Sequence, residues 1–410
     1  MDFELWRRKR LDMKIIFKII FFCFVFLLIR FISLYSQSIF STVGLGEIRY
    51  FINTRSTGMG HIGLATNDDL SYNRMNPAIS AEIKDTSFNT GFVFEGVRIS
   101  QKDNSLSSSL SRFNGASVSI KIRNGFIITA GLFPFSDYEY EFYSRADNVD
   151  YSIDLVGNGG LSSVRGGIGL RLLKRLTVGF SFNRLFGRLE EKTIIDFDDN
   201  DYTDTKDSID KILYGNYFTS GFLFNINEKT RFGGFFSTGS KLSGRIEYLH
   251  IYGPSSGSPK IKIDLPYSFG LGWIYQLNLK TILGADLFIF KGSQLKYNGS
   301  SADFVQDAYK ICFGGEITPS NNVFDDYIRR MSYRFGFFIN SPYIKNIDNS
   351  SIKEYFIASG FGLPFYNNNA RIDISIEFGT RGSGNKDLAS EKIVRLSLGF
   401  SSNEKWFSRD

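Results

Sequence analysis

The sequence of 410 residues is poor in the side chains on which most catalytic and metal sites depend. It contains two histidines, His61 and His250, and two cysteines, Cys23 and Cys312. Neither histidine belongs to a recognisable catalytic constellation with serine, cysteine or carboxylate. Two cysteines are too few for a cysteine metal cage or a disulfide framework. We therefore expect no enzyme, no metal site and no cofactor.

Proline and clustered positive charge are also scarce. The chain has 8 Pro against 40 Gly, 42 Phe and 21 Tyr, a mixture that favours many strands joined by turns over a helical bundle. The formal net charge of +6 comes from residues scattered along the chain, without the basic face that nucleic-acid binding requires. The composition therefore predicts an all-β protein without a nucleic-acid partner.

Long apolar runs are lacking except near the N-terminus. There, a cluster of basic residues precedes an apolar run over 15–28, and small polar residues follow at Ser36 and Ser38. This pattern predicts a secretory signal peptide over residues 1–37. The alternative is an uncleaved membrane anchor, but Lys18 lies within the apolar run and Arg30 follows it closely.

From residue 86 onward, apolar and polar residues alternate with period two. Val118 and Ile120, for example, alternate with Ser119 and Lys121. This spacing is that of a β-strand with one apolar and one polar face. Charged side chains such as Lys121, Asp373 and Glu377 would be costly in lipid, so we expect them to face a lumen.

A soluble β-sandwich also has strands in which apolar and polar residues alternate. The lengths of the connections between the expected strands distinguish a membrane barrel from such a sandwich. About fourteen strands are joined alternately by long polar loops, such as 101–110, and by connections that are mostly tight turns, such as Asn124-Gly125. The segment 318–330 is the one long exception. An even strand number with all other long loops at one end is typical of outer-membrane barrels. We predict an antiparallel transmembrane barrel over 86–402 and a C-terminal tail over 403–410.

Several local patterns have two interpretations. Gly58, Gly60 and Gly63 match a dinucleotide fingerprint, but the strand before it and the helix after it are missing, so close packing inside a barrel is favoured. The acidic run over 196–204 could bind Ca²⁺, yet it lacks the glycine and distant glutamate of an EF-hand. Tyrosines near strand ends suit either an aromatic girdle or cross-strand packing; these are Tyr138, Tyr140, Tyr143 and Tyr267.

Three stretches resemble the FadL/TodX-type outer-membrane transporters of long-chain fatty acids and other hydrophobic compounds. The first runs from the glycine-rich segment 58–65 to Asn76-Pro77-Ala78, the second covers 157–187, and the third joins 377–382 to the terminal 395–400. The resemblance implies an N-terminal hatch over 38–85 that plugs a barrel of about fourteen strands. It also implies hatch or gating roles for Gly58, Gly60, Gly63, Asn76, Pro77 and Ala78. Unlike many barrels, the chain ends on Asp410 rather than on an aromatic residue.

The expected function follows from this resemblance. We expect passive transport of hydrophobic compounds, such as long-chain fatty acids, across the outer membrane of a Gram-negative-type bacterium. The alternatives are a barrel that serves as scaffold or shuttle for secreted or surface proteins, and an outer-membrane lipid hydrolase. The expected partners are hydrophobic small molecules, outer-membrane lipid and lipopolysaccharide, and other envelope proteins.

Overall fold

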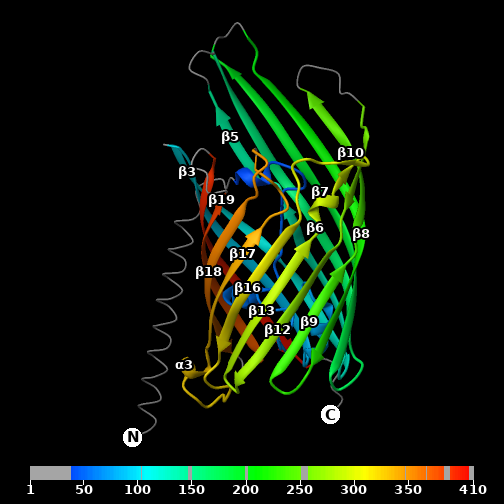
Figure 1. Cartoon of the computed structure of the whole chain (residues 1–410), viewed down its shortest axis with the longest axis vertical. Helices are drawn as coiled ribbons and strands as arrows, with labels where there is room; N and C mark the ends of the chain where they lie inside the picture. Colours follow the sequence, from blue (N-terminus) through cyan, green and yellow to red (C-terminus); the bar gives the residue numbers. More distant parts are fainter. Residues whose placement is uncertain are drawn as a thin grey trace.

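A computed structural model describes most of the chain as a closed barrel with a segment folded inside it (Figure 1). The described residues are 38–102, 104–145, 150–198, 202–250, 257–346, 348–365, 367–382 and 388–405. The predicted signal peptide over 1–37 lies outside this part of the chain, as do residues 406–410 of the predicted tail and residues 199–201 of the acidic run.

The wall is a single antiparallel sheet of 14 strands, three of which are built from two segments each. The wall strands are β2 (Thr86–Gln101), β3 (Asn104–Arg123), β4 (Phe126–Asp137) with β5 (Tyr140–Ser144), β6 (Tyr151–Arg171), β7 (Leu176–Phe197), β8 (Thr205–Asn225), β9 (Thr230–Ser237) with β10 (Ser240–His250), β11 (Lys260–Leu265) with β12 (Ser268–Asn278), β13 (Thr281–Phe290), β16 (Ala308–Ile317), β17 (Ser332–Ser341), β18 (Lys353–Phe365), β19 (Ala370–Gly382) and β20 (Ser390–Glu404).

The sheet closes where the first wall strand pairs with the last. β2 and β20 are in continuous antiparallel register from Thr86 opposite Glu404 to Ser100 opposite Ser390. Closure leaves no strand edge unpaired, which a sheet must achieve before it can stand in hydrocarbon. The prediction of an all-β antiparallel barrel of about fourteen strands with its N-terminal region inside is confirmed.

The two ends of the barrel differ. At one end, which we call the turn end, connections are short apart from the 318–331 segment, which contains α3 (Tyr327–Arg330). At the opposite loop end, β13 connects to β16 through η3 (Gly292–Gln294), β14 (Lys296–Tyr297) and β15 (Ser300–Ser301). The strands β6, β7 and β8 rise above the rest of the wall at the loop end (Figure 1).

The prediction of a long loop over 101–110 is wrong. β3 begins at Asn104, and Gln101 pairs with Asn104 across a tight turn. The sequence Ser105–Ser111 has two leucines among five serines and so shows only weak apolar alternation, but its backbone pairs with β2, and backbone pairing does not depend on side-chain polarity. Polar strand ends that rise above the membrane are therefore easily mistaken for loops.

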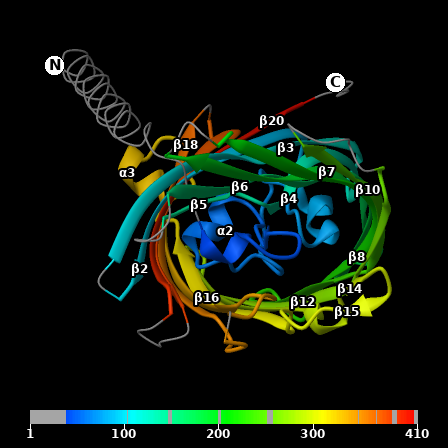
Figure 2. The ribbon, with the colours of Figure 1, turned by 90° about the horizontal axis from the view of Figure 1, so that it is seen from above.

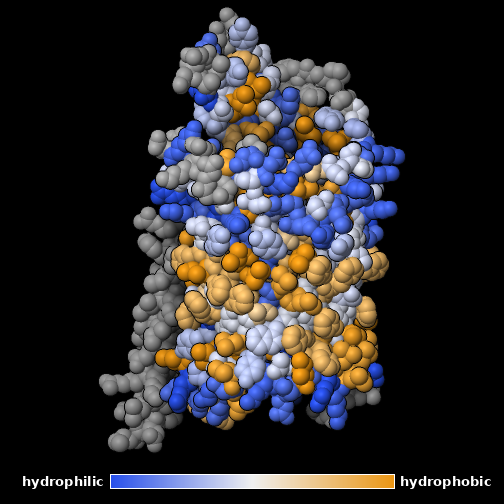
Figure 3. All heavy atoms as spheres, viewed as in Figure 1, coloured by the Kyte–Doolittle hydropathy of each residue, from blue (hydrophilic) through white to orange (hydrophobic). Residues whose placement is uncertain are grey.

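Side chains on the two faces of the wall differ as predicted. Outward positions carry exposed apolar side chains such as Phe313 and Phe335. Hydrophobic residues form a band around the molecule on the face that Figure 3 shows. The inward carboxylates of Asp373 and Glu377 are each 2% exposed. Tyr138 is also inward, in an apolar cluster near the loop end, so it belongs to no aromatic girdle. Among the described residues, no helix is long and apolar enough to cross a membrane.

The N-terminal segment 38–85 lies within the ring of strands (Figure 2). It contains η1 (Ile39–Ser41), β1 (Glu47–Ile48), α2 (Thr54–Gly58) and η2 (Pro77–Glu82). We call residues 38–85 the hatch. Its first residues contact Glu391 near the loop end, and its last residues lead into β2 at the turn end, so the hatch runs along the lumen.

The two-faced wall predicts a strong dependence on where a charge is placed. Phe313→Lys, at the middle of β16 on the outer face, should lower the free energy of unfolding by about 2–4 kcal/mol, because the ammonium is forced into hydrocarbon. The measurement is urea unfolding from lipid vesicles. The control Tyr202→Lys, at an exposed loop-end position, should leave the unfolding free energy nearly unchanged; equal losses in both variants would contradict the assignment of the outer face.

Candidate functional site

The hatch meets the wall first through glycines that leave room for its backbone. Gly60 has a φ of +65°, and a Cβ there would lie 2.6 Å from the backbone nitrogen of Phe337. From the wall side, a Cβ on Gly336 would lie 2.4 Å from the carbonyl carbon of Met59. The Met59 turn therefore packs backbone to backbone against β17.

Asn76-Pro77-Ala78 forms a second contact, with the opposite part of the wall. The Asn76 side chain is fully buried; its Nδ2 donates to the carbonyl oxygens of Leu64 (2.8 Å) and Phe222 (2.9 Å). Its Oδ1 accepts from the Ala78 N–H at 3.1 Å and so caps η2. A Cβ on Gly179 of β7 would lie 2.3 Å from the Pro77 carbonyl carbon. This short sequence thus fixes a bend of the hatch to β7 and β8.

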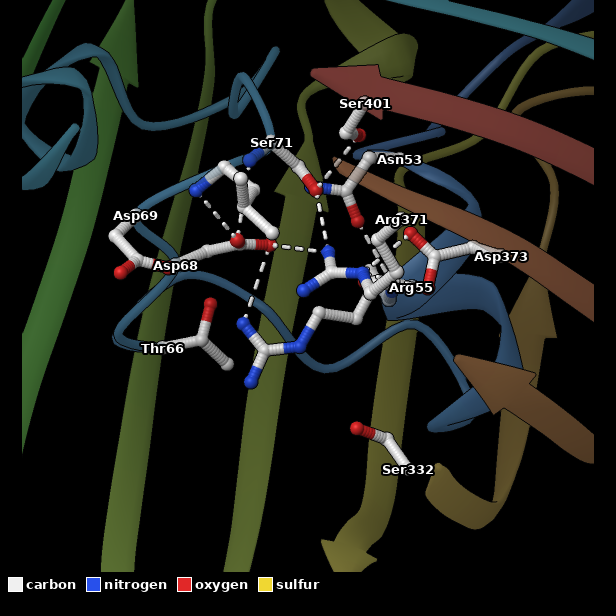
Figure 4. A network of polar contacts seen from close by, with 12 residues as sticks. Asn53, Arg55, Thr66, Asp68, Asp69, Ser71, Ser332, Arg371, Asp373 and Ser401 are labelled. Carbon is white, nitrogen blue, oxygen red and sulfur yellow. Dashed lines mark hydrogen bonds and ion pairs between the residues drawn. The ribbon is translucent and has the colours of Figure 1, made fainter. Parts of the chain in front are cut away.

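Between these two contacts, a buried carboxylate of the hatch binds two arginines (Figure 4). Asp68 Oδ2 lies 3.1 Å from Nη1 of Arg55, in the hatch, and 3.2 Å from Nη2 of Arg371, on β19. Asp68 Oδ1 accepts from the backbone N–H groups of Leu70 (3.1 Å) and Ser71 (3.0 Å). Burial alone would raise the pKa of Asp68, but the guanidiniums of Arg371 and Arg55 outweigh it and hold the pKa well below its ordinary value.

The same arginines extend the network across three wall strands. Arg55 binds Glu316 of β16 in bidentate geometry, at 2.9 and 2.7 Å. Glu316 also accepts from Arg334 Nε at 2.6 Å, and Arg334 donates to Asp373 at 2.6 Å. We call Arg55, Asp68, Glu316, Arg334, Arg371 and Asp373 the lumen ion network. Because its three arginines and three carboxylates alternate, removing one member leaves a buried charge without compensation.

A second charged cluster holds the beginning of the hatch at the loop end. Arg381 of β19 donates to Glu47 of the hatch at 2.8 Å and forms an ion pair with Glu354 at 2.6 Å. Ser38 donates to Glu391 at 2.9 Å and accepts from Arg381 at 3.1 Å. The hatch is therefore bound by charged groups at both levels of the lumen.

His61 is part of the same interface and not of a hydrolytic constellation. Its Nε2 lies 2.8 Å from Oε1 of Glu377, and its ring packs edge-on against Phe338 with centroids 4.7 Å apart. No hydrogen bond joins His61 to a serine among the described residues. The described residues likewise contain no cluster of His, Cys, Asp and Glu that could hold a metal ion.

Small cavities lie beside the hatch in the lumen. Two cavities along the hatch have volumes of about 40 and about 50 Å³, whereas sites for drug-sized ligands span roughly 300–1,000 Å³. A larger cavity of about 760 Å³ opens at the turn end, where its lining includes Arg55, Glu82, Arg231, Lys280 and Glu316. It is polar and suits water or polar groups better than an alkyl chain.

The six residues expected in the hatch fall into separate contacts. Gly58 and Gly60 lie against β18 and β17, and Asn76, Pro77 and Ala78 lie against β7 and β8. Gly63 instead lies beside Ile52 within the hatch, where its N–H donates to Asp286 at 2.7 Å. Their role in gating stays a prediction.

The arginines of the lumen ion network were not anticipated from the sequence. Arg334 and Arg371 stand at inward positions of period-two strands, as do Asp373 and Glu377, and that shared parity is the signal that could have found them. Arg55 has no such signal, because the hatch has no regular period.

Comparisons with known proteins agree on the fold and add a family. The family model described as BamG matches residues 13–410. The structure is similar to a Pseudomonas aeruginosa FadL homologue, with a TM-score of 0.64, 13% identity, and 87% of this chain and 99% of that chain covered. It is also similar to the toluene transporter TodX of P. putida, with a TM-score of 0.62, 14% identity, and 90% and 100% covered. The comparison with curated proteins gives no match. The chain is thus an outer-membrane barrel with a FadL-like fold.

The lumen ion network predicts that Asp68 holds the hatch in place. Asp68→Asn removes the charge shared by Arg55 and Arg371 and should cost about 3–5 kcal/mol of hatch docking, because two buried guanidiniums lose their counter-charge. Hydrogen exchange of the hatch amides should accelerate while exchange of the wall strands stays slow. The neighbouring Asp69→Asn is the control, since the carboxylate of Asp69 forms an ion pair with the exposed Lys84 and with no other described residue; equal protection in both variants would count against the network.

The close contact between Gly336 and the Met59 turn gives an independent prediction, which the native cysteine Cys312 can report. Cys312 is buried and is the free cysteine of the described residues, so its thiol reacts with a maleimide only when the hatch shifts. Gly336→Ala places a Cβ on the Met59 backbone, at a cost of about 1–3 kcal/mol, and should speed labelling. Gly166→Ala, whose Cβ meets nothing within 4 Å, should label as slowly as the wild type. Slow labelling of both variants would show that the hatch tolerates the added methyl group.

Proposed function

The chain belongs to the BamG family, and from this premise we propose that it serves the machinery that assembles β-barrel proteins (BAM) in the outer membrane, as a partner barrel. The proposal corresponds to the alternative in which the barrel serves as a scaffold for other proteins, and it specifies that these proteins are β-barrels of the outer membrane. The family match over nearly the whole chain is the observation that carries the proposal.

The filling of the lumen supports a scaffold over a channel. The hatch is tied to the wall by the lumen ion network, by the Arg381 cluster and by the glycine contacts. The cavities along the hatch, at about 40 and 50 Å³, are smaller than a fatty acid requires. A rigid, filled barrel presents fixed outer surfaces, which is what a scaffold needs.

The turn end offers a surface for a partner on the periplasmic side. Phe324 and Leu279 are each 92% exposed, and Ile328 of α3 is 69% exposed. The connections that bear them touch, because the Thr318 N–H donates to the carbonyl oxygen of Lys280 at 2.8 Å. Large apolar side chains left this exposed on adjacent connections favour contact with another protein.

Co-purification from membranes tests the proposal. The tagged full-length protein, extracted in mild detergent, should retain the barrel-inserting subunit of BAM in a constant ratio, detected by antibody. Phe324→Ser with Ile328→Ser should lower the retained amount several-fold, because it removes the exposed apolar contact. Tyr202→Ser, at the loop end, is the matched control and should retain the full amount.

Depletion of the protein separates the proposal from its rival. Loss of other barrel proteins from the outer membrane, with unchanged uptake of a labelled fatty acid, supports an assembly role. Normal levels of barrel proteins, or wild-type protein that retains no BAM subunit, would overturn it.

Transport of hydrophobic compounds is the second candidate, favoured by the similarity of the fold to the FadL homologue and to TodX. At 13–14% identity, that similarity concerns the fold. Transport would require the hatch to leave its contacts, with Gly58, Gly60 and Gly63 or Asn76-Pro77-Ala78 as the points of movement. Uptake by vesicles that contain the protein, lost on cross-linking of the hatch to the wall, would favour this candidate.

A further inference from the structure

Two cations face each other on the outer surface of the barrel. Arg98 of β2 and Lys392 of β20 are directly opposite in the antiparallel register, and both side chains are exposed. Directly opposed residues on one face have Cβ atoms about 4.5–5.5 Å apart, and like charges at such positions repel. Arg98 forms one long hydrogen bond, 3.4 Å to the Ser105 hydroxyl, which compensates no charge.

The acidic residues nearby point the other way. In the loop-end parts of β2, β18, β19 and β20, the described carboxylates are inward and at most 3% exposed; they are Glu95, Glu354, Glu377 and Glu391. Among the described residues, neither Arg98 nor Lys392 forms an ion pair. Lys353, exposed on β18, adds a third outward cation at this level. The outer surface here therefore carries positive charge that no described carboxylate balances.

An apolar groove lies directly beside these cations. It has a volume of about 680 Å³, and Lys392 forms part of its lining together with Phe337, Tyr355, Ile357, Phe378 and Val394. We call it the wall groove. The five apolar residues just named are 37–55% exposed and stand on the lipid-facing side of β17 to β20.

The position along the strands identifies the membrane leaflet. Arg98 is three residues from the loop-end tip of β2, and Val394 and Phe378 lie one outward position farther toward the turn end. Longer connections of outer-membrane barrels face the outside. The cations therefore lie at the boundary between the apolar band and the polar rim of the barrel, at the level of the outer leaflet. The wall groove extends from there into the hydrocarbon.

We propose that Arg98, Lys392 and the wall groove form a binding site for a phosphorylated glycolipid of the outer leaflet, with its phosphate between the two cations and an acyl chain in the groove. A phosphate accepts charge-assisted hydrogen bonds from the guanidinium and the ammonium together and so removes their repulsion. Tyr355 and Thr380, on the same outward row, supply hydroxyl groups that can donate to the head group. An acyl chain is apolar and therefore packs favourably against the apolar side chains of the wall groove.

Native mass spectrometry of the full-length protein, titrated with lipid A that carries two phosphates, tests the site. The wild type should bind one molecule tightly, and Arg98→Gln with Lys392→Gln should weaken binding about tenfold or more. Lys392→Arg should retain binding, because it keeps the charge. The matched control is Arg184→Gln, which removes an exposed outward cation of β7 that stacks on Tyr214 and lines no groove; it should bind as the wild type does.

Two further lipids test whether the phosphate is the group that is bound and which class of lipid supplies it. Chemically dephosphorylated lipid A should bind weakly to every variant, and phosphatidylglycerol should bind the wild type less tightly than lipid A does. Wild-type affinity should also fall as salt rises, which tests the site even if a variant fails to fold. Equal binding by the double variant, by dephosphorylated lipid A or by phosphatidylglycerol, or binding without salt dependence, would overturn the proposal.

Discussion

The structure depends on pairing charges that are enclosed by the wall of a membrane barrel. Asp68 of the hatch is shared between Arg55 and Arg371, and Arg55 in turn binds Glu316. In the absence of the hatch, Arg371, Arg334, Glu316 and Asp373 would stand in an open lumen filled with water. With the hatch in place, these side chains are largely buried, and each charge has a partner at hydrogen-bond distance. The pairing thus makes burial of the lumen compatible with its polar side chains.

Close approach is the second requirement, and glycine provides it. A wall lined only by side chains would keep the hatch backbone too far away for short ion pairs. Gly314 and Gly336 let the Met59 turn touch the strands, while Gly179 and Gly221 admit Pro77 and Asn76. The charges and the glycines therefore act together: backbone contact sets the distance, and the charges at that distance set the orientation.

The sequence predicted the wall far better than the hatch contacts. Period-two alternation identified strands such as β19 and β20 and the inward direction of Asp373 and Glu377, because membrane and lumen impose opposite chemistry on successive residues. It misplaced the start of β3, since the serine-rich beginning of this strand shows only weak apolar alternation. The partner of Asp68 could not be predicted, because Arg371 is about three hundred residues away and only the closed barrel brings the two together.

The same alternation explains why the outer surface carries cations that have no ion-pair partner among the described residues. Glu95, Glu354 and Glu391 point inward to the arginines of the lumen and Glu377 points inward to His61, so the described outward positions at the loop end of these strands hold cations or neutral residues. A carboxylate added outside to balance Arg98 and Lys392 would meet the phosphate-rich face of the outer leaflet and be repelled by it. Cations at the same positions are attracted to the phosphates. At the loop end of these strands, the described outward charges are therefore cations, whereas the lumen holds acids together with the arginines that bind them.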